Sequence, residues 1–124
     1  HRVDRRQRQM CIRDRWKKGE AFTIVGDGEQ RRDFTHVDDV VRANIAAAER
    51  ASDITGETIN VGTGTNHSVN QLADMICKSY TKNFIPPRPA EARVTLADIS
   101  KAKKLLGYMP SIEISDWIDE YKVQ

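Results

Sequence analysis

The chain has few cysteines and no long apolar segment, and both absences narrow the classes of protein to which it can belong. Its two cysteines, Cys11 and Cys77, form no Cys-x-x-Cys pattern and have no partnering histidines. This excludes a disulfide scaffold and a cysteine-ligated zinc site, and it favours a reducing compartment. No apolar run approaches the ~20 residues that span a bilayer, and no signal-peptide pattern is present. We therefore expect a cytoplasmic protein without a metal site or a membrane partner.

Two glycine pairs fall short of a dinucleotide-binding loop. The G-x-G-x-x-G fingerprint requires a third glycine three residues after the second. Arg31 occupies that position after Gly26-Asp27-Gly28, and His67 occupies it after Gly62-Thr63-Gly64. The sequence therefore predicts no cofactor-binding residue within this chain.

A basic arm precedes a mildly acidic remainder. The net charge of the whole chain is +2, which on its own hints at nucleic-acid binding. Residues 1–15 carry six arginines against two aspartates, so this arm holds +4 and residues 16–124 hold −2. The arm has almost no apolar face with which to order itself. We interpret it as a disordered or artefactual extension, of the kind that adapter read-through leaves in assembled environmental genes; a nucleic-acid-binding tail is the alternative.

Helices alternate with short strands in the pattern of residues 16–124. This order predicts an α/β fold, or α+β in isolation, but no long Val/Ile-rich strand of a doubly wound sheet is present. The core of this segment therefore looks incomplete by itself. The expected elements are a helix end at 16–20, strands at 21–25 and 58–61, extended stretches at 32–35 and 85–89, a helix from a Thr35–Asp38 capping box to Glu49, a helix begun by a Ser68–Gln71 capping box, a helix from Asp98 to Gly107 and a final helix at 114–121.

The run from Gly26 to Val40 is the most specific motif in the chain. A glycine turn presents an arginine, Arg32, which is followed by an extended dipeptide and a capped helix start. The run resembles the G-x-G-x-Q-x-R-D-[FYW]-x-[YH]-V-x-D pattern of the NAD-dependent epimerase/dehydratase family, the extended short-chain dehydrogenases/reductases that act on nucleotide sugars. In that family the pattern lies in the C-terminal, substrate-binding lobe of a Rossmann-type fold. The resemblance implies that residues 16–124 are such a nucleotide-sugar-binding portion.

Arg32 is the first candidate binding residue. A guanidinium can hold two phosphate oxygens at once and stays charged at physiological pH. The pattern alone is equally compatible with an ordinary ion pair to Asp33 or Asp39. The resemblance implies contact with the diphosphate of the substrate, while Arg31, next to it in an extended stretch, should point the other way.

Arg88 and Glu91 are the second candidate pair. They lie in a proline-stiffened segment that gives their side chains a defined position at low entropic cost. By itself the spacing also fits an exposed ion pair. The segment resembles the family's R-P-G-[DE]-x-R, which implies that Arg88 reaches the diphosphate and Glu91 holds the ribose. Ala90 replaces the usual glycine, and this departure bears on the local turn and on the reach of Glu91.

Four apolar or small side chains complete the candidate site. By periodicity alone they are core residues, and pocket walls are also mostly apolar. The resemblance implies that they line the base and ribose pocket. Asp39 we interpret as structural. The four residues are Thr23, Val25, Phe34 and Val69.

The family resemblance also implies what the complete protein would do. It would oxidise a nucleotide sugar transiently, usually at C4, with tightly held NAD, and would act as a homodimer. The tyrosine and lysine that transfer protons in that family have the spacing Tyr-x-x-x-Lys, which this sequence lacks, so we expect catalysis to depend on a missing N-terminal NAD-binding half. A non-catalytic nucleotide-binding module is the alternative, and the acidic body disfavours a nucleic-acid partner.

Overall fold

The computed structural model describes residues 17–123, so the interpretation of the arm at 1–15 lies outside the described residues. Lys17 and Lys18 are helical, and Gly19 then adopts a positive φ of 71°, which agrees with the helix end expected there. Within residues 17–123, no helix has both the length and the apolar character needed to cross a membrane.

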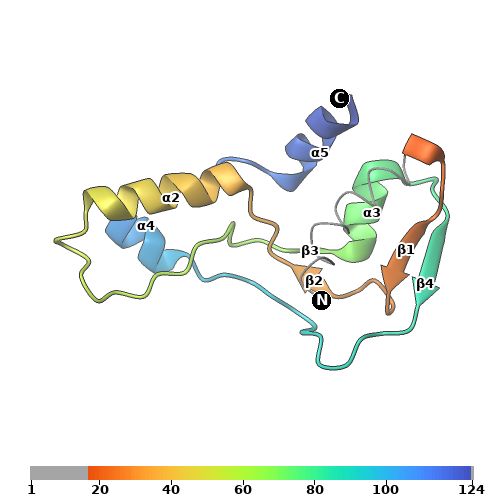
Figure 1. Cartoon of the computed structure of the whole chain (residues 1–124), viewed down its shortest axis with the longest axis horizontal. Coiled ribbons are helices and arrows are strands. Elements are labelled where there is room, and N and C mark those ends of the chain that lie inside the picture. The colour runs from red at the N-terminus through yellow and green to blue at the C-terminus, as the bar shows by residue number, and fades with distance from the viewer. Residues whose placement is uncertain (1–16, 124) are drawn as a thin grey trace.

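One half of the molecule is built on a pair of parallel strands, β1 (Phe22–Val25) and β4 (Lys82–Ile85), covered by α3 (Val69–Cys77) (Figure 1). Strand alternation in β1 turns Phe22 and Ile24 inward against Ala73. The Phe22 ring stacks on Tyr80 with their centroids 4.7 Å apart. This small cluster anchors β1, and the C-terminal end of β1 leads into the candidate site.

The other half is a pair of helices, α2 (Val37–Glu49) and α4 (Ser100–Leu106), which lie side by side (Figure 1). Their shared cluster contains Ala43, Ala102 and Leu106 together with Tyr108, whose hydroxyl donates to the Gly62 carbonyl at 2.8 Å. The apolar periodicity that predicted α2 is present, but Val37, Val41 and Ile45 form its exposed face. The buried face of α2 carries the small Ala43 and the carboxylate of Asp39.

Polar contacts and two short strands join the halves. Strand β2 (Arg31–Arg32) pairs antiparallel with β3 (His67–Ser68). Helix α5 (Ile114–Val123) packs on α3. The side chain of Asp39 is fully buried and accepts hydrogen bonds from the backbone N–H groups of Ser111 and Ile112, which ties α2 to the segment before α5.

The helix starts agree with the sequence in one case and differ in two. Ser68 and Gln71 form the expected capping box. At α2 the N-cap is His36, whose Nδ1 accepts from the backbone N–H of Asp38 at 3.1 Å, because the Thr35 hydroxyl donates to Asp33 instead. At α4 the N-cap position is one residue later than expected, although Asp98 still accepts from the backbone N–H of Ser100.

The strand expected at 58–61 does not form among the described residues. A strand needs a neighbour for its backbone hydrogen bonds, and within residues 17–123 no other strand lies beside this segment. The mixture of parallel and antiparallel strand pairs with helices is a partial α/β arrangement, as the sequence predicted.

Candidate functional site

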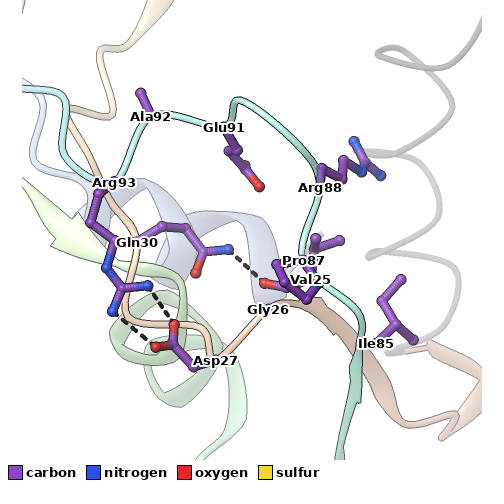
Figure 2. Close-up of a pocket in the computed structure, with 10 residues that line it drawn as sticks. All are labelled: Val25, Gly26, Asp27, Gln30, Ile85, Pro87, Arg88, Glu91, Ala92 and Arg93. Atoms are coloured by element: carbon purple, nitrogen blue, oxygen red, sulfur yellow. Dashed lines mark hydrogen bonds and ion pairs between the residues drawn. The ribbon is translucent and has the colours of Figure 1, made fainter.

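A pocket opens where β1 ends and the chain after β4 passes over it. Its volume is about 420 Å³. One wall is the glycine turn that follows β1, and the opposite wall is the segment that leaves β4 (Figure 2). The lining residues are Val25, Gly26, Asp27, Gln30, Ile85, Pro87, Arg88, Glu91, Ala92 and Arg93.

The glycine turn is rigid for reasons that can be traced to its residues. Gly26 and Gly28 have φ of 71° and 76°, a backbone region that L side chains rarely adopt. A Cβ at Gly28 would lie 2.3 Å from Oδ1 of Asn70, so a larger residue there would also have to displace the Asn70 side chain. Asp27 closes the turn by accepting from the backbone N–H of Glu29 at 2.9 Å. The turn therefore presents the Asp27 carboxylate in a fixed position.

The opposite wall is a loop, residues 86–92, that is anchored at both ends. At its start the N–H of Gly26 donates to the Ile85 carbonyl at 2.8 Å, and just after its end the N–H of Arg31 donates to the Arg93 carbonyl at 2.9 Å. Ala90 has φ of 59°, the left-handed conformation that the family's glycine would adopt without strain. The departure at position 90 therefore leaves the local turn left-handed, at a cost in backbone strain.

Arg32 and Glu91 meet at this pocket. Nη2 of Arg32 lies 3.2 Å from Oε1 of Glu91, and Nη1 of Arg32 donates to the Arg31 carbonyl at 2.8 Å. Arg88 lines the same pocket, but Figure 2 shows its side chain directed away from Glu91. Arg88 is exposed and makes no hydrogen bond or ion pair among residues 17–123.

The remaining predicted site residues are more scattered. Val25 lines the pocket, and Thr23 lies on the same face of β1, exposed. Val69 packs against the cluster of Phe22 and Ile24, as its periodicity suggested. Phe34 is half-buried in the chain after β2. Among the residues that the structure describes, the site therefore brings Val25, Arg88 and Glu91 together directly and Arg32 through Glu91.

Arg31 points away from this group, as expected for the residue that precedes Arg32 in an extended strand. Its Nε donates to Oδ1 of Asn66 and its Nη2 to the Asn66 carbonyl, both at 2.8 Å. Arg31 thus fastens β2 to the chain before β3, and its charge is not presented to the pocket.

Two pocket contacts were not assigned from the sequence. Gln30, which is 8% exposed, donates from Nε2 to the Val25 carbonyl at 2.8 Å. Arg93 holds both carboxylate oxygens of Asp27, at 2.7 and 2.9 Å (Figure 2). The hydrogen bonds from Arg93 lower the pKa of Asp27 to about 2. The only signals for these roles were the positions of Gln30 and Arg93 in the two motifs that resemble the family.

Asp33, which follows Arg32, is the second feature that sequence reasoning missed. Its carboxylate accepts from the backbone N–H of Thr63 at 2.9 Å, from that of Gly64 at 3.1 Å and from that of Ala97 at 3.3 Å. Burial tends to raise the pKa of Asp33, but the hydrogen bonds from Thr63, Gly64 and Ala97 outweigh it, so the pKa lies below its usual value. Two segments distant in sequence, one at Thr63–Gly64 and one at Ala97, are therefore held at the residue next to Arg32.

The glycine turns and the acidic side chains of the described residues are the candidate sites for a dinucleotide phosphate and for a metal ion. The glycine turn at 26–28 leads to β2 and the one at 62–64 leads to β3, so neither begins a helix whose N-terminus could receive a pyrophosphate. Residues 17–123 contain no cluster of three histidine, cysteine or acidic side chains able to hold a metal ion.

Comparison with known proteins identifies the family. A family model described as GDP-mannose 4,6 dehydratase matches residues 8–121. The UDP-glucuronate 4-epimerase of Thermodesulfobacterium geofontis is 42% identical over 98 residues, which are 75% of this chain and 29% of that protein. The chain thus spans about a third of the length of the curated relatives it matches.

Solved structures of similar proteins agree with this match. The UDP-glucuronic acid 4-epimerase of Bacillus cereus, in complex with UDP-glucuronic acid and NAD, aligns with a TM-score of 0.78 and 41% identity over 85% of this chain and 35% of its own. The UDP-glucose 4-epimerase of Thermotoga maritima, with UDP-glucose, gives a TM-score of 0.73 at 36% identity over 85% of this chain and 34% of its own. The fold, the motifs and these similarities together show that the chain belongs to the NAD-dependent epimerase/dehydratase family of Rossmann-type proteins, of which it is a partial α/β segment.

Proposed function

We propose that this chain is the nucleotide-sugar-binding portion of an NAD-dependent sugar epimerase or dehydratase, and that its pocket holds the nucleoside diphosphate of a UDP-sugar-like substrate. The observation that carries the proposal is the meeting of Arg32 with Glu91 at a pocket that Arg88 also lines. Relatives solved with UDP-glucuronic acid or UDP-glucose support this choice of ligand class.

The three side chains divide the work by charge. Arg32 and Arg88 neutralise the diphosphate, for which a guanidinium fork is suited. The phosphate takes the place of the Glu91 carboxylate at Arg32, and Glu91 is then free to accept hydrogen bonds from ribose hydroxyls. Arg88 is exposed, so its long side chain can turn toward the pocket when an anion arrives.

Four further side chains complete the binding site in this proposal. Val25 and Thr23 pack on the base and ribose from β1, and Phe34 and Val69 contribute from the segments on either side. Binding of the nucleotide handle orients the sugar without itself performing chemistry, and such orientation supplies part of the rate enhancement of enzymes.

The complete protein would use NAD to oxidise the sugar transiently at C4, and it would act as a homodimer. NAD would supply hydride exchange when it is bound, and the described residues of this chain would only bind and orient the sugar nucleotide. The missing N-terminal half would therefore provide the NAD site and the residues that transfer protons.

Titration of the 124-residue chain with UDP tests the proposal. Arg32→Gln removes a charge-assisted hydrogen bond and is expected to weaken binding about tenfold or more. Lys101→Gln, the control, removes one positive charge in α4 and should leave UDP affinity within about twofold, because Lys101 pairs with Glu57 and does not line the pocket. Isothermal titration calorimetry measures both, and equal losses in the two variants would contradict the proposed role of Arg32.

A further inference from the structure

The ion pair between Asp27 and Arg93 joins the two walls of the pocket. The contact is bidentate, with Nη1 of Arg93 2.7 Å from Oδ1 of Asp27 and Nη2 2.9 Å from Oδ2. Both side chains are more than half exposed, at 57% for Asp27 and 61% for Arg93. A single exposed ion pair contributes little to stability. Its role therefore lies in the segments of the pocket that it holds in place.

Asp27 is the fixed end of this pair. The two positive-φ glycines hold its backbone, and its carboxylate also closes the turn through the N–H of Glu29. Nδ2 of Asn70, in α3, donates to the Asp27 carbonyl at 3.0 Å. The carboxylate is ionised throughout the physiological range, since Arg93 lowers the pKa of Asp27 to about 2.

The loop at 86–92 has few other tethers. No backbone–backbone hydrogen bond holds these residues among the contacts of residues 17–123. The Glu91–Arg32 pair is the second side-chain connection, and in the proposed function this pair opens when a diphosphate occupies Arg32. The loop would then depend on Arg93 to stay over the bound nucleotide.

We propose that Asp27 and Arg93 are a positioning pair that holds the 86–92 loop, with Arg88 and Glu91, over a bound nucleoside diphosphate. This inference rests on the proposed function, because it takes UDP as the occupant of the pocket. In this arrangement Arg93 acts through Asp27, since its Nη1 and Nη2 both donate to the Asp27 carboxylate. The pair acts by keeping the loop in place while the Arg32–Glu91 contact is exchanged for ligand.

A double-mutant cycle on the 124-residue chain tests the pair. Asp27→Asn keeps the acceptor for Glu29 but loses the charge, and Arg93→Gln removes the guanidinium fork. Each is expected to weaken UDP binding about three- to fivefold, the range that an ion pair of good geometry can supply. Because the two residues act through one contact, the double variant should bind no more weakly than either single one.

The control is another exposed ion pair, between Lys101 in α4 and Glu57, far from the pocket. Glu57→Gln should leave the dissociation constant for UDP unchanged, and circular dichroism melts should show that every variant is folded at the temperature of the titration. Unchanged binding in Asp27→Asn and Arg93→Gln, or losses that add in the double variant, would overturn the inference while leaving the proposed function intact. If the wild-type chain did not bind UDP at all, both would fail together.

Discussion

Replacing Ala90 by glycine should stabilise the chain, although it removes a methyl group. Ala90 is exposed and has φ of 59°, so its Cβ makes little packing but forces a strained backbone. The left-handed region costs an L residue about 1–2 kcal/mol. Glycine removes that strain, but the greater conformational freedom of the unfolded chain lowers the gain in stability by about 0.4–1 kcal/mol. The expected net gain is about 0.5–1 kcal/mol, or a Tm rise of about 2–6 °C for a domain of this size.

Thermal melts followed by circular dichroism measure this effect. Ala92→Gly is the matched control, because Ala92 lies in the same loop and is also exposed but lacks a positive φ. That variant should lose about 0.4–1 kcal/mol through the unfolded state alone. A Tm for Ala90→Gly that is equal to or below that of Ala92→Gly would show that residue 90 is not strained and would refute the reasoning.

Further substitutions probe the contacts that hold the segments around the site. Gly62→Ala should destabilise the chain by about 1–3 kcal/mol, because a Cβ there would lie 2.4 Å from Cβ of Ala97; urea unfolding checks this. Asp39→Ala removes a buried carboxylate that accepts from the N–H groups of Ser111 and Ile112, and the same assay should show a loss of about 1–3 kcal/mol. Ser68→Ala removes the cap of α3 and should cost about 1 kcal/mol. The stabilisation from Asp27, whose folded pKa of about 2 is below its ordinary 3.8, is present above that ordinary value and is lost as the pH falls through about 2. The melting difference between wild type and Asp27→Asn should therefore shrink steadily as the pH is lowered from about 5 toward about 2.

Local signals in the sequence were sufficient for the helices. The Ser68–Gln71 capping box and the glycine that ends α4 depend on only a few neighbouring residues, so both could be predicted from the sequence. Thr35 was expected to cap α2, but its hydroxyl is used by Asp33, a contact that depends on the turn between them. Strands were harder, because β4 is largely exposed and is defined by its pairing with β1, which is distant along the chain.

The site could be predicted as far as the family motifs extended. Arg32, Arg88 and Glu91 were assigned through that resemblance, and the structure brings Arg32 and Glu91 into contact. Asp27 and Arg93 are 66 residues apart, so nothing in the spacing of either motif linked them. Their contact follows from two backbone anchors on either side of the loop, which only the folded chain reveals.

Within the part of the chain that the structure describes there are two separate apolar clusters, one between β1 and α3 and one between α2 and α4. Because few apolar contacts join them, each half can open with its own free energy, and the polar contacts of Asp33 and Arg31 mark the seam between the two. Amide hydrogen exchange should therefore proceed at different rates in the two halves. Local opening of the α2–α4 half should then leave a ligand bound in the pocket of the other half.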